Sequence, residues 1–271
     1  NKVYFEHTGR YFNHNVHSVR VLDDMVNWNI SLQTLDGILC HNGELELKEY
    51  RPCEMSTFVE YDKKVEACYV DENAIGELIP CTLEGCVMRI CDIIAYLGKD
   101  RQDAMRLNLL KESPFTAGAI GTSNGEIINN FSVNIIENSY GKDYLKMDEE
   151  YFDALRQAKK ENYEMIYNNK SLNDLYENEI RPMFGELYEE LLRQAESGDK
   201  SSVFYRHHMA YMEKNNFYVK SHVRKPYAEQ EKNQLVVDYL ASMTDDYFIA
   251  LYHYLFPKGK HDVKFVGYFD L

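Results

Sequence analysis

Three polar side chains recur at steps of four residues in MRICDIIAYLGKD, a mostly apolar stretch at residues 88–100. On a helix with 3.6 residues per turn, Asp92, Tyr96 and Asp100 line up along one face. Burying an unpaired carboxylate among apolar side chains costs on the order of several kcal/mol. We therefore expect that a positive charge meets Asp92 or that this face opens onto a polar cavity. A solvated stripe on a surface helix is the plainest alternative.

A second group of candidate residues lies in YFNHNVHSVRVL, residues 11–22. His14 and His17 stand about one helical turn apart, and Arg20 follows one turn later. Histidine transfers protons near neutral pH and is the commonest metal ligand in proteins. His14 is thus a candidate catalytic residue, although a helical histidine is more often structural. His41 is a weaker candidate of the same kind.

Composition limits the classes of function. The chain has 271 residues and a formal net charge of −14, so a protein that coats nucleic acid is unlikely, and a phosphate site would need a local cluster of cations. No apolar run approaches the roughly 20 residues of a membrane span, and no signal peptide is evident. Six cysteines occur without a CxxC pair, which predicts a reducing, cytoplasmic setting. A zinc site made of these thiols is the less favoured alternative.

Helical periodicity dominates the pattern and predicts an all-α fold. Capping signals open three of the expected helices, at Ser123-x-x-Glu126, at Asp148 and, more weakly, at Ser171-x-x-Asp174. Residues 43–80 are polar and irregular, and we expect a surface excursion there. The tail 262–271 alternates weakly and predicts a short strand. The helices are expected at residues 16–26, 32–40, 82–110, 126–139, 149–167, 171–195, 203–214 and 234–256.

These residues carry a resemblance to a known family. TLEGCVMRICDIIAYLGKDRQDAMR, residues 82–106, resembles the signature helix of the HD-domain deoxynucleoside triphosphate (dNTP) triphosphohydrolases, TLEGxxxRxxDxxAYxxxDxxDAxR. Two more segments are similar to this family in the same order: FNHNVHSVRVL at residues 12–22 and VVDYLASMTDDYFIALYHYLFP at residues 236–257. Three ordered matches over most of the chain are a specific signal.

The resemblance implies hydrolysis of a dNTP, such as dGTP, to a deoxynucleoside and inorganic triphosphate with a divalent metal such as Mn²⁺ or Mg²⁺. Asp92 matches one of the family's four metal ligands. Tyr96 matches the residue that packs on the deoxyribose, and Asp100 the carboxylate that accepts from a sugar hydroxyl. His14 matches a histidine that assists attack at the α-phosphorus. Lys160 is the candidate phosphate contact, and a solvated helix face is its plainer interpretation.

The sequence also departs from this family. The family's other ligands, a histidine and a His-Asp pair, precede the segment similar to residues 12–22, so the sequence resembles the carboxy-terminal two thirds of such an enzyme. Its single His-Asp dipeptide, His261-Asp262, is best explained by chance. Ile93 stands where many relatives carry a polar or basic residue. We expect residues 1–140 to be the remainder of an HD-type core and 141–271 a helical region packed on it.

Two other functions compete with this interpretation. One is an HD-type hydrolase of another nucleotide phosphoester, which would release orthophosphate. The other is a non-catalytic helical module that binds nucleotides or partners, which would hold no tightly bound metal. The resemblance further implies a homo-oligomer, a dimer or a hexamer, and no membrane partner. The acidic balance of the chain disfavours binding of nucleic acid.

Overall fold

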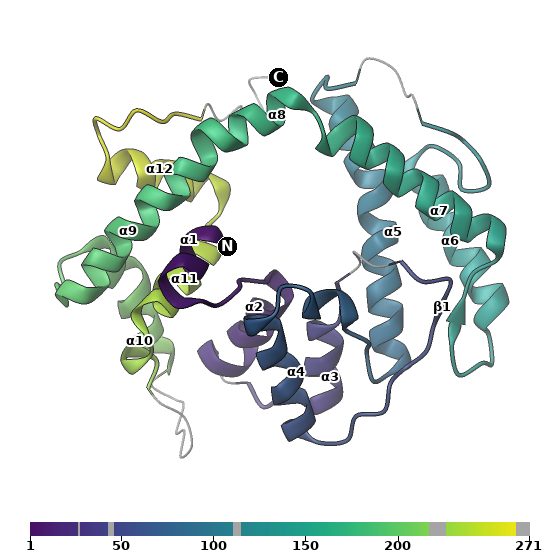
Figure 1. Ribbon diagram of the computed structural model, residues 1–271, viewed down its shortest axis with the longest axis horizontal. Helices are drawn as coiled ribbons and strands as arrows, with labels where there is room; N and C mark the ends of the chain where they lie inside the picture. Colours follow the sequence, from purple (N-terminus) through teal and green to yellow (C-terminus); the bar gives the residue numbers. More distant parts are fainter. Residues whose placement is uncertain (27, 43–45, 111–114, 217–225, 264–271) are drawn as a thin grey trace. The chain divides into compact units, whose positions relative to one another are not determined.

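A computed structural model describes residues 1–26, 28–42, 46–110, 115–216 and 226–263. The chain there is mostly helical, with only a small two-stranded sheet, which confirms the predicted all-α fold (Figure 1). The α-helices are α1 (Lys2–Thr8), α2 (His14–Arg20), α3 (Leu32–Leu39), α4 (Phe58–Val70), α5 (Leu83–Arg106), α6 (Asn124–Ser139), α7 (Glu149–Asn162), α8 (Lys170–Leu175), α9 (Arg181–Ser197), α10 (Ala210–Asn216), α11 (Lys232–Ala241) and α12 (Asp245–Leu255). Four π-helical turns (Val21–Met25, Tyr163–Tyr167, Tyr176–Ile180, Tyr205–Met209) and two 3₁₀ turns (Ala74–Glu77, Tyr227–Glu229) extend or link them.

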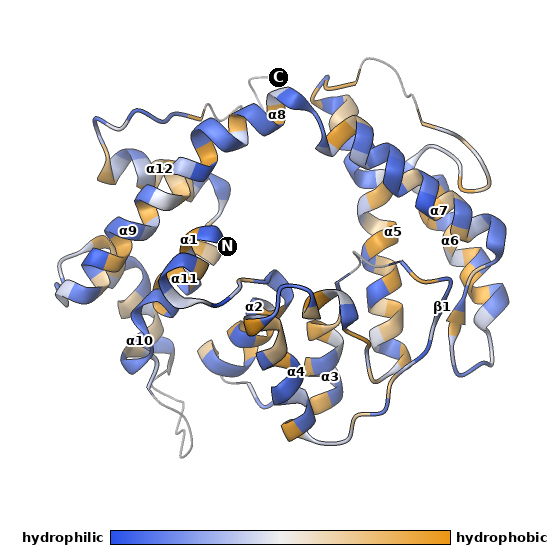
Figure 2. Cartoon of the chain, viewed as in Figure 1, coloured by the Kyte–Doolittle hydropathy of each residue, from blue (hydrophilic) through white to orange (hydrophobic). Residues whose placement is uncertain are grey.

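The chain divides into two compact units. Unit 1 comprises residues 1–12, 20–28 and 170–271, and unit 2 comprises residues 13–19 and 29–169. The division expected from the sequence, between residues 140 and 141, separates a catalytic core from an extension and stays a prediction. Hydrophobic residues alternate with hydrophilic ones along the helices of both units (Figure 2). In the described part of the chain, no helix has the length and apolar character needed to span a membrane.

Helix α5 organises unit 2. It begins at Thr82, whose hydroxyl accepts a hydrogen bond from the Gly85 amide at 3.0 Å. Two glycines then let neighbouring helices approach: Gly85 lies against Gly37 of α3, and Gly98 lies against Asn124 at the start of α6. The buried side of α5 packs in a core that includes Ile90, Ile93, Ile94, Leu97, Ile127, Phe131 and Leu155.

A two-residue sheet ties the segment after residue 45 to the start of α7. Strand β1 (Glu49–Tyr50) pairs in antiparallel fashion with β2 (Leu145–Lys146). Asp148 occupies the N-cap position of α7, as the sequence predicts. Its carboxylate, however, accepts from the side chain of Asn134 at 2.8 Å instead of capping the helix. Helix α7 is therefore anchored to α6 at its first turn.

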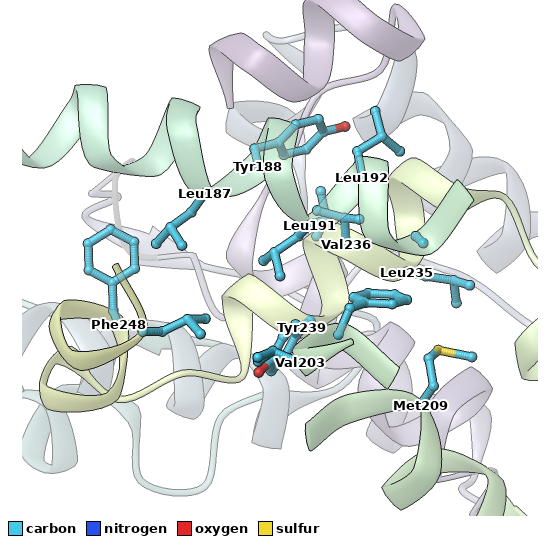
Figure 3. Packing of buried hydrophobic residues seen from close by; sticks show 14 of the residues in the cluster. Leu187, Tyr188, Leu191, Leu192, Val203, Met209, Leu235, Val236, Tyr239 and Phe248 are labelled. Atoms are coloured by element: carbon cyan, nitrogen blue, oxygen red, sulfur yellow. The ribbon is translucent and has the colours of Figure 1, made fainter. Parts of the chain in front are cut away.

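Unit 1 has its own hydrophobic core, formed mainly by α9, α11 and the helical segment at 203–216. Leu187 and Leu191 of α9 interdigitate with Leu235 and Val236 of α11, and all four side chains are fully buried (Figure 3). The spacing of these residues by one turn or less on each helix is what the amphipathic pattern predicts.

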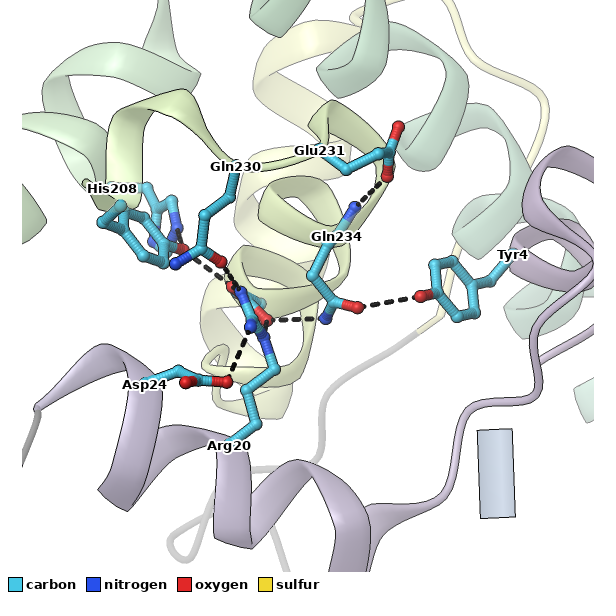
Figure 4. A network of polar contacts seen from close by, with 9 residues as sticks. Tyr4, Arg20, Asp24, His208, Gln230, Glu231 and Gln234 are labelled. Carbon is cyan, nitrogen blue, oxygen red and sulfur yellow. Dashed lines mark hydrogen bonds and ion pairs between the residues drawn. The ribbon is translucent and has the colours of Figure 1, made fainter. Parts of the chain in front are cut away.

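A buried ion pair connects two of the segments that resemble the triphosphohydrolase family. The Arg20 guanidinium donates to both carboxylate oxygens of Asp238, at 2.8 and 2.6 Å, and Asp238 is completely buried. Arg20 also donates to Gln230, and it pairs with Asp24 at 3.3 Å (Figure 4). No local sequence pattern predicts this pairing, because its partners are 218 residues apart in the chain.

Several predicted elements differ in the structure. Residues 43–80 were expected to be irregular, but they include helix α4. This helix has a complete capping box formed by Thr57 and Glu60. The predicted cap at Ser171 is also wrong, because α8 already begins at Lys170. The helix expected at 234–256 breaks before Thr244, which caps α12. The strand predicted at the tail lies mostly at 264–271, outside the described residues, and residues 262 and 263 are not in a strand.

Candidate functional site

The three polar residues of α5 share one helix face, as their spacing predicts. Asp92, Tyr96 and Asp100 are each half-buried, so this face is neither part of the core nor fully solvated. Ile93, beside them in the sequence, is fully buried in the core of unit 2. Ile93, noted in the sequence as a departure from the resemblance, is thus a packing residue of this core. An isoleucine so buried cannot contact a phosphate.

A cavity of about 680 Å³ opens beside this face, between Tyr96 and the outer side of α7. Tyr96 and Lys160, two of the predicted site residues, both line it, whereas Asp92, Asp100 and His14 do not. The cavity lies wholly within unit 2. Its lining comprises Glu46, Tyr96, Asp153, Arg156, Gln157, Lys159, Lys160, Asn162, Tyr163 and Tyr167. Cations and aromatic rings in one cavity can hold an anionic ligand that has a flat, apolar part.

Three cations line this cavity, and they differ in how far they are neutralised. Lys159 is half-buried and forms an ion pair with Glu46. Lys160 is exposed, and its ammonium lies 3.9 Å from Glu164. Arg156 pairs with no carboxylate of the described residues, and its guanidinium lies 5.9 Å from the Phe152 ring. Sequence reasoning missed Arg156. Its position one turn before Lys160 on an amphipathic helix was the available signal.

Asp100 stands next to the cavity through a hydrogen bond. The hydroxyl of Tyr167, which lines the cavity, donates to the Asp100 carboxylate. Burial and this bond raise the pKa of Tyr167 well above its usual value, so the hydroxyl keeps its proton. Asp100 is thus already oriented by a neutral donor. Its predicted role as acceptor from a sugar hydroxyl stays a prediction.

A buried cluster holds the carboxy-terminal part of α7 against α5. Arg101 donates to Asn162 at 2.8 Å and to Glu161 at 3.2 Å, and all three side chains are buried. Burial acts to raise the pKa of Glu161, but hydrogen bonds from Thr116 and Gln157 and the charge of Arg101 outweigh it and lower the pKa. The cluster fixes the cavity wall, since Asn162 itself lines the cavity.

His14 lies at the exposed start of α2, in unit 2. Its ring meets that of His41 edge to face, with 5.2 Å between ring centres. The two histidines singled out separately in the sequence are therefore neighbours. The catalytic role predicted for His14 stays a prediction.

The residues around Asp92 do not by themselves form a metal centre. No described residue forms a hydrogen bond or an ion pair with its carboxylate. Across the described ranges, no three His, Cys, Asp or Glu side chains converge on a point where they could hold a metal ion. A catalytic metal needs about three protein ligands, and Asp92 offers one.

The His-Asp dipeptide is explained by packing within unit 1. The His261 ring lies 3.1 Å from Glu179, and the Asp262 amide donates to the same carboxylate at 3.2 Å. His253 pairs with Asp262 at 3.2 Å. These contacts fasten the segment after α12 and agree with a chance resemblance to the family's ligand pair.

Comparison with known proteins agrees with these features. Residues 145–254 match the sequence model of the phosphohydrolase-associated domain. This match covers the part of the chain from strand β2 to helix α12. No solved structure matches the chain.

The chain is a distant homologue of deoxyguanosinetriphosphate triphosphohydrolase-like proteins over most of its length. One such protein, from Caldanaerobacter subterraneus, is 27% identical over 65% of this chain and 47% of its own length. A second, from Clostridium perfringens strain SM101, is 26% identical over 87% of this chain and 58% of its own length. A third, from Clostridium tetani, is 25% identical over 91% of this chain and 60% of its own length. The chain thus spans about half to three fifths of these relatives.

Proposed function

We propose that the protein hydrolyses a dNTP, dGTP or a similar one, to a deoxynucleoside and inorganic triphosphate. The observation that carries the proposal is the shared cavity of Tyr96, Lys159 and Lys160. It combines an aromatic surface from the signature helix with cations on α7. The relatives described above, named for the triphosphohydrolysis of deoxyguanosine triphosphate, supply the substrate class.

In this proposal the parts of the nucleotide are recognised by different side chains. The deoxyribose packs on the Tyr96 ring, and its hydroxyl donates to Asp100, which Tyr167 already orients. The phosphates approach the three cations on α7. Tripolyphosphate carries several negative charges, and three neighbouring cations can neutralise them together better than one cation can.

Asp92 contributes one metal ligand in this proposal. The remaining ligands would come from outside the described residues, because those residues offer no set of three donors. A divalent metal, when bound, would polarise the phosphate and lower the pKa of a bound water. His14 would assist attack at the α-phosphorus. Assembly into a homo-oligomer, a dimer or hexamer, belongs to the same proposal, and sedimentation would measure it.

The test uses protein expressed from its complete gene, with dGTP and Mn²⁺ or Mg²⁺. We expect deoxyguanosine and inorganic triphosphate in equal amounts, and no turnover by Asp92→Asn. Asp103→Asn is the matched control, since Asp103 lies on the same helix and pairs only at its surface, with Lys99 and Arg106. Turnover by Asp92→Asn at the wild-type rate would remove Asp92 from the site. Release of orthophosphate would favour another nucleotide phosphoester, and binding without turnover a non-catalytic module.

A further inference from the structure

One carboxylate of the cavity lining already pairs with one of its cations. Glu46 lines the cavity and forms an ion pair with Lys159, the most buried of the three cations. About a fifth of each side chain is exposed, 23% for Glu46 and 21% for Lys159. Water therefore screens this pair less than it screens the pair of Lys160 and Glu164 at the surface. A phosphate that contacts Lys159 must compete with Glu46.

The backbone holds Glu46 close to its partner. Immediately after it, the Leu47 amide donates to the Tyr50 hydroxyl at 3.0 Å, and Lys48 pairs with Glu149 at the start of α7. Strand β1 then pairs with β2. A carboxylate tethered in this way has a high effective concentration at Lys159, higher than a free anion in solution reaches.

We propose that Glu46 is a built-in competitor for the anionic ligand of this cavity, and that a polyphosphate must displace it from Lys159. The inference rests on the proposed function, because it takes the cavity to be the phosphate-binding site. A ligand that also reaches Arg156 and Lys160 gains contacts that compensate for the displaced pair. A ligand limited to a single cation does not.

Removal of the Glu46 charge tests this inference directly. Inorganic tripolyphosphate is titrated calorimetrically into the 271-residue chain and into Glu46→Gln, with circular dichroism to confirm folding. We expect Glu46→Gln to bind roughly three- to tenfold more tightly, since a competing ion pair of this burial is lost. Orthophosphate should remain weak in both proteins.

Asp153→Asn is the matched control. Asp153 also lines the cavity but forms no ion pair or hydrogen bond with the described residues, so its neutralisation removes only general repulsion. We expect a change below about twofold for this variant. An equal gain in both variants would overturn the competition, and so would unchanged or weaker binding by Glu46→Gln, which would make Glu46 a positioning residue for Lys159. Absence of tripolyphosphate binding in all three proteins would overturn both this inference and the phosphate-binding role of the cavity.

Discussion

The hydroxyl of Tyr167 donates a hydrogen bond to Asp100 across the gap between the π-helical turn after α7 and the carboxy-terminal half of α5. Tyr167 lies outside the three segments that carry the resemblance, yet it orients Asp100, which lies in one of them. Burial and the Asp100 charge keep the pKa of Tyr167 high, so the bond persists throughout the neutral range. Helix α5 alone therefore does not fix the position of the Asp100 carboxylate, because Tyr167 lies outside this helix.

Removal of this hydroxyl should weaken nucleotide binding more than it weakens the fold. For Tyr167→Phe we expect dGTP affinity to fall roughly three- to tenfold, since Asp100 loses the bond that orients it. Tyr163→Phe is the control, because Tyr163 lines the same cavity and its hydroxyl forms no hydrogen bond with the described residues. Equilibrium dialysis with dGTP measures both variants. An equal loss of dGTP affinity in the two variants would show that Tyr167 does not orient Asp100.

The buried pair of Arg20 and Asp238 should dominate the stability of unit 1. Asp238→Ala leaves the Arg20 guanidinium without its buried partner, which should cost about 3–5 kcal/mol of unfolding free energy. Asp24→Asn removes only the outer partner of Arg20. Because the Asp24 side chain is 37% exposed, this variant should lose less than about 1 kcal/mol of unfolding free energy. Urea unfolding followed by circular dichroism measures both. Similar midpoints for the two variants would contradict the importance of the buried pair.

His208 should make the fold sensitive to acid. Burial lowers its pKa from 6.5 to about 4, against an opposing effect of Asp238. Its ring lies 2.7 Å from the Tyr227 hydroxyl, which in turn donates to Asp238. Between these two pKa values the unfolded chain binds a proton that the folded chain does not, so stability falls as pH drops through this window. The full loss is about 3 kcal/mol.

The measurement is the unfolding free energy of the wild type and of His208→Gln at pH 7 and pH 4.5. We expect the variant to be less stable at pH 7 but to lose less stability on acidification than the wild type. The same loss in both proteins would attribute the acid sensitivity to other groups. Well above pH 6.5 the histidine is neutral in both states, so its contribution to the unfolding free energy no longer changes with pH.

The close approach of α5 and α6 depends on Gly98. A β-carbon at this position would lie 2.5 Å from the side-chain oxygen of Asn124 and 2.7 Å from its Cα atom. Gly98→Ala should therefore destabilise the chain by about 1–3 kcal/mol. Gly125→Ala is the matched control, since nothing lies within 4 Å of a β-carbon there and alanine favours the helix. Thermal unfolding should show a lower midpoint for the first variant and an equal or higher one for the second.

Local signals predicted most of the fold. The capping box at Ser123 and Glu126 placed the start of α6, and the apolar periodicity of residues 82–106 placed α5. Helix α4 was missed because its polar composition hides its period, although Thr57-x-x-Glu60 was a readable cap. The local sequence pattern predicted a helix correctly where that helix has both a capping residue and an apolar face.

The candidate site was harder to predict than the fold. Spacing alone put Asp92, Tyr96 and Asp100 on one face, because helix geometry is local. The partners of this face are distant in the sequence: 113 residues separate Glu46 from Lys159 and 67 separate Asp100 from Tyr167. No motif encodes such pairs, since tertiary packing decides them. Lys160 was predicted as the phosphate contact. Lys159 and Arg156 line the same cavity and are also positively charged.

The most direct test of the central claim, that this cavity binds a deoxynucleotide, is the affinity of the 271-residue chain for dGTP. We compare the wild type with Tyr96→Ala and use Tyr140→Ala as the control, because Tyr140 is 87% exposed and lies outside the cavity. We predict roughly tenfold weaker binding for Tyr96→Ala, from the lost contact with the sugar, and no change for Tyr140→Ala. Equal dGTP affinity in all three proteins would contradict the claim.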